Sequence, residues 1–218
     1  VGPGLMVSLL VGVETAKALS YAWEKPLYGV NHLEGHLYSV LADTTIPMEI
    51  FNSPVIALIV SGGHTELLQV HGLGRYTLLG KTRDDAAGEA FDKVAKMLGL
   101  PYPGGPALAR AAEEGNAVAF AMPRPMIDSG DWDFSFAGIK THVLYLLRDL
   151  RKNSIVPPVP DIAASFQEAM CDVLVAKTIH AALANNVSSV IIAGGVSANT
   201  RLREMMHEAH LSRGIRCL

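Results

Sequence analysis

The fold is decided by the run Val55-Ile56-Ala57-Leu58-Ile59-Val60, which is followed by Ser61-Gly62-Gly63-His64 and then by residues 65–70. Six consecutive apolar residues are typical of a fully buried strand. The adjacent glycines predict a tight turn, so we expect the chain to return as the second strand of a hairpin. A buried hairpin of this kind belongs inside a sheet.

The chain outward from this hairpin alternates between strand and helix patterns. Further strands are predicted at 26–30, which would be short and buried, at 75–79, and at 188–193, where the chain runs into a second pair of glycines. Helices are predicted from about Leu5, at 32–41 behind the cap Asn31, from the N-cap acids Asp84 and Asp85 to about Leu98, and at 107–114, 136–151, 162–184 and 200–213. This order predicts a mixed α/β fold, in which ligands usually bind at the strand ends.

Composition limits the partners and the compartment. The 218 residues carry a net charge of −3, so no overall positive field would draw the protein to nucleic acid. Contact with RNA would need a local basic patch or a partner subunit. The two cysteines, Cys171 and Cys217, form no CxxC pair, which argues against a disulfide framework and fits a reducing cytoplasm.

The first apolar stretch, residues 5–23, raises the question of a membrane span. Glu14 and Lys17 interrupt it and no basic region precedes it. We therefore expect a buried helix, no targeting segment and no membrane partner.

Two histidines are candidate metal ligands. His32 and His36 are spaced i, i+4, so on a helix both imidazoles can reach one ion. Two surface or helix-capping histidines would show the same spacing. The zinc-protease motif HExxH places its general base directly after the first histidine. Here Glu34 comes two residues after His32, and at about 100° per residue it would face away from the metal, which argues against hydrolysis by that mechanism.

The glycine turns are candidate nucleotide sites. Gly62 and Gly63 would let backbone N–H groups face an anion, although a tight hairpin alone would also explain them. The apolar strand that opens through Gly194-Gly195 toward Asn199 suits a nucleotide, or is simply a packed strand–helix turn. Asp92 could accept hydrogen bonds from ribose hydroxyls. Glu89 and Lys93, four residues apart on the same helix, could form a surface ion pair.

Seven segments in order together resemble the tRNA threonylcarbamoyladenosine synthase transferase family, formerly called O-sialoglycoprotein endopeptidase or glycoprotease. They are GPG at 2–4, NHLEGH at 31–36, VSGGHTEL at 60–67, DDAAGEAFDKVAK at 84–96, YPGGP at 102–106, DFSFAGIKT at 133–141 and GGVSANTRLRE at 194–204. The resemblance covers the whole chain. His64 and the GEAFDK wording are similar to the bacterial or organellar branch.

The resemblance implies an actin-like ATPase fold, related to ribonuclease H, with two α/β lobes and a ligand cleft between them. Residues 1–50 would be the remnant of the first lobe with the metal-binding helix, and residues 51–218 the second lobe with a helical insertion near 100–185. The implied site residues are His32 and His36 for one divalent metal ion, iron or zinc, and Ile59, Val60, Ser61, Gly62, Gly63, Asp92, Gly105 and Asn199 for the substrate or nucleotide.

The family completes its metal site with an aspartate downstream of the last motif found here, and begins with a strand and a phosphate loop that this sequence lacks. We therefore expect a chain truncated at both ends and inactive alone.

The activity implied is transfer of a threonylcarbamoyl group from threonylcarbamoyl-adenylate to N6 of an adenosine beside the tRNA anticodon, in the cytoplasm and with partner subunits. No residue stands out as a general base. A metalloprotease, a non-catalytic nucleotide-binding scaffold and a kinase-like ATPase remain as alternatives, since one fold supports several functions.

Overall fold

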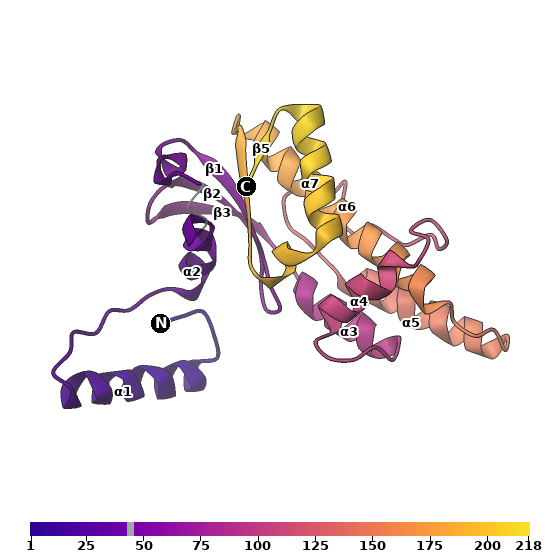
Figure 1. The fold of residues 1–218 in the computed structure, drawn as a ribbon, viewed down its shortest axis with the longest axis horizontal. Helices are drawn as coiled ribbons and strands as arrows, with labels where there is room; N and C mark the ends of the chain where they lie inside the picture. The colour runs from indigo at the N-terminus through magenta and orange to yellow at the C-terminus, as the bar shows by residue number, and fades with distance from the viewer. Residues whose placement is uncertain (43–45) are drawn as a thin grey trace.

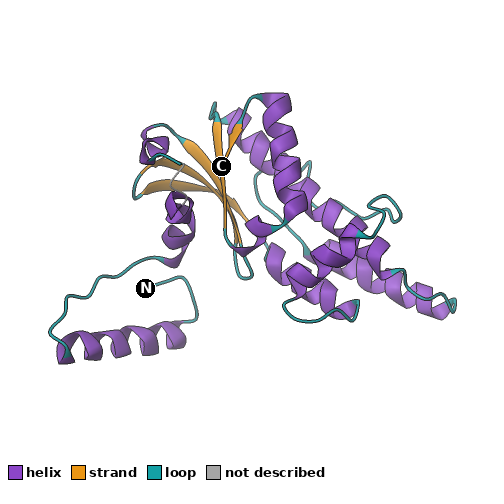
Figure 2. Cartoon of the chain, viewed as in Figure 1, coloured by secondary structure: helices purple, strands orange, loops and turns teal. Residues whose placement is uncertain are grey.

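The computed structural model, which describes residues 1–42 and 46–218, is built around a five-stranded sheet (Figures 1 and 2). The strand order is β3-β2-β1-β4-β5. β1 pairs antiparallel with β2 and parallel with β4. The bounds are β1 Val55–Val60, β2 Thr65–Gly72, β3 Arg75–Lys81, β4 Ser189–Ala193 and β5 Arg216–Cys217. The predicted hairpin is therefore present, and its first strand is the centre of the sheet.

β1 is buried along its whole length because both faces of the sheet are covered. Ile56, Leu58 and Val60 join the larger hydrophobic cluster, which is built with the helices α3 to α7. The alternate residues of β1 join a smaller cluster with α2 and the short 3-10 helices η1 and η2. The bounds are α2 His32–Tyr38, η1 Ser39–Ala42, η2 Met48–Asn52, α3 Ala87–Met97, α4 Gly104–Glu113, α5 Ala137–Lys152, α6 Val159–Ala184, η3 Gly195–Ala198 and α7 Thr200–Arg213.

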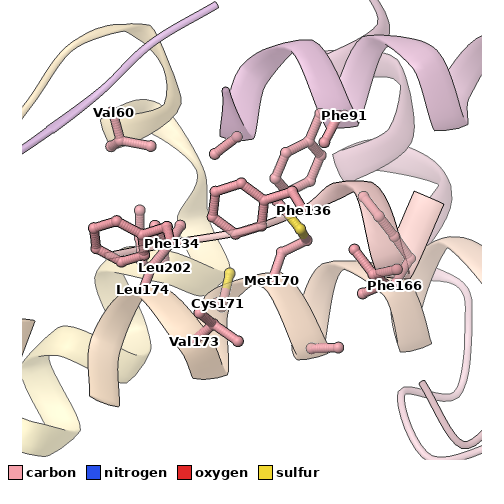
Figure 3. Close-up of a cluster of buried hydrophobic side chains, with 14 of the residues drawn as sticks. Val60, Phe91, Phe134, Phe136, Phe166, Met170, Cys171, Val173, Leu174 and Leu202 are labelled. Carbon is pink, nitrogen blue, oxygen red and sulfur yellow. The ribbon is translucent and has the colours of Figure 1, made fainter. Parts of the chain in front are cut away.

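Aromatic rings fill the larger cluster beside α6 (Figure 3). Phe91 of α3 meets Phe166 of α6 edge to face, with the ring centroids 5.3 Å apart. Phe134 and Phe136 stack at 6.1 Å just before α5. Aromatic pairs of this kind add to the stabilisation from burial alone. The Phe91–Phe166 pair links α3 to α6, and Phe134 and Phe136 pack the segment before α5 into the same cluster.

The prediction of a buried first helix is wrong. α1 (Met6–Ala22) forms, but no residue of this fully described helix is buried, and Figure 1 shows it standing apart from the sheet. Met6 is 83% exposed and Leu10 59%. An apolar sequence indicates a tendency to be buried, but burial also requires a facing surface. Among the described residues, no helix combines the length and apolar character needed to cross a membrane.

The predicted strand at 26–30 is also wrong. This segment is extended but belongs to no sheet, and Tyr28 is 80% exposed. Its end is fastened to the chain start instead: the Val1 ammonium donates to the Val30 carbonyl at 2.7 Å, and the His32 N–H donates to the Gly2 carbonyl at 2.7 Å. These two hydrogen bonds hold the start of the chain against residues 30–32, so the segment between them, which contains α1, forms a closed loop.

Candidate functional site

The turn Ser61–His64 at the end of β1 is held by its own backbone and by α3. The Ser61 N–H donates to the His64 carbonyl at 2.8 Å, and the Gly88 N–H donates to the Ser61 carbonyl at 3.1 Å. The buried Thr65 hydroxyl accepts from the Ala87 N–H at 2.8 Å, so it satisfies a free donor at the start of α3. The start of α3 therefore lies directly against the first glycine turn.

Gly88 makes this approach possible, and the sequence analysis did not single it out. A Cβ on Gly88 would lie 2.6 Å from the Ser61 carbonyl oxygen. The adjacent turn glycines, Gly62 and Gly63, are different: no described atom outside their immediate neighbours lies within 4 Å of a Cβ built there. The turn thus presents open backbone on its outer side, which is what close approach by a ligand requires.

The second glycine pair lies beside the first. β1 and β4 are parallel, with Ile59 opposite Ala193, so their carboxyl ends meet at the same edge of the sheet. Gly194 leaves this edge at a φ of +96°, and a Cβ there would lie 2.4 Å from the Val60 carbonyl oxygen. Both predicted turns therefore meet at one edge, as expected for a ligand site in an α/β fold.

A cavity of about 520 Å³ opens at this edge. Four of the predicted residues line it: Gly62, Asp92, Gly105 and Asn199. The volume is within the usual range for small-molecule sites, about 300–1,000 Å³. The cavity also has walls that the sequence analysis missed, contributed mainly by α3, α4 and the start of η3: Gly88, Phe91, Ala109, Arg110, Glu113 and Gly195.

The remaining predicted residues lie beneath or beside the cavity and not in its lining. Ile59 and Val60 are fully buried in β1, and Ser61 is 8% exposed. The Ser61 hydroxyl accepts from the His64 N–H at 3.1 Å, so it stabilises the turn. Gly63 is exposed at the tip of the turn. Ile59 and Val60 therefore support the turn from within the sheet and do not line the cavity.

Asp92 joins α3 to the start of α4. Its Oδ1 accepts from the Gly105 N–H at 3.1 Å, and within the described chain no partner is found for Oδ2. Glu89 forms the ion pair with Lys93 at 2.8 Å that the sequence allowed. Glu89 therefore lies at the surface, and Asp92 lies in the cavity wall.

His32, at the start of α2, and His36, one turn later, lie close together. Their ring centroids are 4.4 Å apart, and His64 from the glycine turn follows at 6.4 Å from His32. Burial lowers the pKa of His36, and the nearby His32 and His64 lower it further. A neutral imidazole is the form that binds metal, and the closeness of the His32 and His36 rings fits one divalent ion. The described residues contain no group of three or more metal-binding side chains.

Glu34 does not share the histidine face. Its carboxylate accepts from the Tyr76 hydroxyl of β3 at 3.4 Å. This contact agrees with the orientation expected from helix geometry, so the Glu34 carboxylate does not occupy the position that HExxH requires.

The sheet order, the cavity at the ends of two parallel strands and the covering helices define a protein of the actin-like ATPase fold. Solved structures agree: HypF from T. kodakarensis covers 94% of this chain at a TM-score of 0.62 and 16% identity, over 35% of its own length. A full-length HypF in a phosphate- and nucleotide-bound form covers 91% at a TM-score of 0.64 and 13% identity, over 41% of its length. At these identities the likeness concerns the fold alone.

The chain belongs to the tRNA N6-adenosine threonylcarbamoyltransferase family, whose model matches residues 1–218. Relatives of that name from Ralstonia pickettii, Verminephrobacter eiseniae and Desulfitobacterium hafniense are 51%, 53% and 52% identical over 99%, 99% and 98% of this chain. The chain spans 62%, 61% and 62% of the length of these relatives.

Proposed function

We propose that this chain contributes the nucleotide cavity and two metal-binding histidines to an enzyme that transfers threonylcarbamoyl from threonylcarbamoyl-adenylate to N6 of an adenosine beside the tRNA anticodon. The observation that carries the proposal is the cavity that brings Gly62, Asp92, Gly105 and Asn199 together. The names of the relatives support N6 of a tRNA adenosine as the acceptor and threonylcarbamoyl as the group transferred, and the family resemblance implies the adenylate as the donor.

The adenylate would lie along this cavity. Its phosphate belongs beside the first glycine turn, where backbone N–H groups can stabilise the negative charge of the leaving AMP. Its ribose belongs beside Asp92, whose Oδ2 has no partner among the residues that the structure describes and can accept from a hydroxyl group. The adenine then extends toward Asn199. The exocyclic amine of adenosine is a weak nucleophile. Holding the mixed anhydride in one orientation toward this amine therefore supplies much of the rate enhancement.

His32 and His36 would hold the metal ion, which we propose to be iron or zinc. When bound, such an ion polarises a carbonyl as a Lewis acid. The 6.4 Å between the ring centroids of His32 and His64 supports a position of the carbamoyl group near both the imidazole pair and the glycine turn. The contact of Glu34 with Tyr76 disfavours the metalloprotease alternative.

Partners and place follow from the same proposal. With a net charge of −3, the chain offers no overall attraction for tRNA, so we propose that partner subunits help to dock it in the cytoplasm. We also propose the division into a first-lobe part, residues 1–50, and a second lobe, residues 51–218, with a helical insertion near 100–185.

The test is an assay of the full-length protein with its partner subunits, threonylcarbamoyl-adenylate and tRNA, scored by modified adenosine. We expect the His32→Ala and His36→Ala variants each to lose at least about 100-fold in activity, because removing a group that only supports a metal ligand already costs about 10–100-fold. Metal content of the purified variants should fall in parallel. The exposed His142 of α5 gives the control His142→Ala, which should keep both activity and metal.

Full activity of the two histidine variants would remove the metal from the mechanism. A protein that binds adenosine nucleotides but modifies no tRNA under any of these conditions would favour the non-catalytic scaffold.

A further inference from the structure

The helix that follows Asn199 determines which end of its amide is the oxygen. Asn199 is the N-cap of α7, and its Oδ1 accepts from the Leu202 N–H at 3.0 Å. A backbone N–H can only donate, so the atom facing it must be the oxygen and not the amide nitrogen. The NH₂ group of Asn199 therefore points away from α7.

Two side chains of α6 contact the hydrogen-bonding positions of the Asn199 amide that α7 leaves free. Gln167 Oε1 accepts from Asn199 Nδ2 at 2.7 Å. Cys171 Sγ lies 4.0 Å from Asn199 Oδ1, within range for a weak S–H donor. Burial raises the pKa of the Cys171 thiol, so the sulfur keeps the proton that it donates. Figure 3 shows Cys171 on α6 in the same cluster of buried side chains as Leu202 of α7.

Most of the hydrogen-bonding groups of the Asn199 amide are then occupied. Oδ1 has two lone pairs and two donors, and one of the two Nδ2 hydrogens is bonded to Gln167. Among the described residues, no acceptor is found for the second hydrogen, and Asn199 lines the cavity. Toward a ligand, the Asn199 side chain therefore offers this second N–H as a hydrogen-bond donor.

The position of Asn199 matches the base of a nucleotide and not its phosphate. The second glycine turn meets the first, where the phosphate would lie, at the same edge of the sheet. From the second turn η3 carries the chain to Asn199, and four residues at about 2 Å each cover about 8 Å. That is close to the separation of phosphate and base in a nucleotide. Adenine presents ring nitrogens as acceptors along its edges.

We propose that Gln167 is a positioning residue that, with Cys171, holds the Asn199 amide so that its one free N–H donates to a ring nitrogen of adenine. The inference rests on the proposed function in that an adenosine nucleotide occupies the cavity. It goes further in naming the direction of the hydrogen bond and the residues that enforce it.

The test is calorimetric titration of the full-length protein with AMP and with 1-deaza-, 3-deaza- and 7-deaza-AMP, each of which replaces one ring nitrogen by carbon. One analogue should bind about tenfold more weakly than AMP, the size expected for one lost hydrogen bond. In Gln167→Met, AMP should bind as weakly as that analogue, and the difference between the two ligands should disappear. Gln167→Glu keeps an acceptor for Asn199 and should keep both the affinity and the discrimination.

Asn199→Asp gives a second variant that does not depend on how Gln167→Met folds. Aspartate caps a helix as well as asparagine does but cannot donate when ionised, so the variant should bind AMP and the sensitive analogue equally weakly. Equal binding of all three analogues and AMP by the unmodified protein would overturn the proposal, as would discrimination that persists in Gln167→Met. These results would leave the proposed function intact, whereas an unmodified protein that fails to bind AMP would contradict both.

Discussion

At the scale of single residues, Gly194 sets how closely the second glycine turn approaches the end of β1. Its φ of +96° is rarely adopted by residues with a side chain, and a Cβ would lie 2.4 Å from the Val60 carbonyl oxygen. We expect Gly194→Ala to lower the free energy of unfolding by at least about 2 kcal/mol, from strain and displaced backbone together. Urea denaturation measures this directly.

The neighbouring glycine provides the control. At Gly195, no described atom beyond its neighbours lies within 4 Å of an added Cβ, and its backbone has no positive φ. Gly195→Ala should therefore change stability by less than about 0.5 kcal/mol, the usual effect of an uncrowded surface substitution. Because Gly195 lines the cavity, the same variant should weaken AMP binding. Equal losses of stability in the two variants would show that crowding at Val60 is not the cause.

At the scale of secondary-structure elements, Asp84 caps a helix far from it in sequence. Its Oδ1 accepts from the Phe136 N–H at 2.7 Å and the Ala137 N–H at 3.2 Å, at the start of α5. The expectation that Asp84 caps the following helix is wrong, because α3 begins later, behind Ala86, and takes its bond from Thr65. Loss of an N-cap typically costs about 1–2 kcal/mol.

We expect Asp84→Ala to lower the free energy of unfolding by that amount in chemical denaturation. Asp128→Ala is the control, because Asp128 is exposed and removing it should cost less than about 0.5 kcal/mol. If Asp84→Ala were as stable as the control, the start of α5 would have to be satisfied by water.

α6 and α7 are joined by a forked ion pair whose strength depends on pH. Arg201 donates to both oxygens of Glu168, at 2.7 and 2.8 Å. The hydrogen bonds from Arg201 lower the pKa of Glu168. A carboxyl group with a lower pKa in the folded state stabilises the fold above its unfolded pKa, about 4.3 for glutamate, and this contribution is lost as pH falls through the folded value.

Arg201→Met should therefore cost about 1–2 kcal/mol at pH 7, since a charged hydrogen bond is lost from a partly exposed pair. Below about pH 4 the gap to the unmodified protein should narrow as Glu168 becomes protonated. Urea titrations at pH 7 and pH 3 measure the free energy of unfolding of Arg201→Met and of the unmodified protein. Arg213→Met, at the end of α7, is the control. A gap that stays constant with pH would mean that Arg201 acts through packing alone.

What the sequence could predict at this scale was local. The hairpin follows from an apolar run and a glycine pair, and the histidine pair follows from helical spacing. Gly88 and Asp84 act on partners 27 and 52 residues away, Ser61 and Phe136, and spacing contains no information about such contacts. Ile59 and Val60 were predicted to line the ligand site, yet a six-residue apolar strand between two layers has both faces covered, so they support the turn from below. The cavity could not be predicted from the sequence, because its lining comes from α3, α4 and η3, which meet only in the folded chain.

At the scale of the whole molecule, burial is distributed unevenly between α1 and the body. Leu108 of α4 is fully buried in the larger cluster, whereas Leu10 of α1 is 59% exposed, although both are leucines within helices. The hydrophobic effect stabilises a fold only by the apolar area that it removes from water. In this chain, the apolar residues of α1 therefore contribute little to the free energy of folding.

The prediction that follows is a matched pair of substitutions in the 218-residue chain. Leu108→Ala removes packed methyl groups and leaves a cavity, so it should cost about 2–5 kcal/mol. Leu10→Ala should cost less than about 0.5 kcal/mol, because alanine keeps the helix propensity and little buried contact is lost. Urea denaturation of both variants gives the comparison. If Leu10→Ala cost more than about 1 kcal/mol, α1 would have to pack in solution against a surface from which this structure separates it, since exposed leucines do not stabilise a helix to that extent.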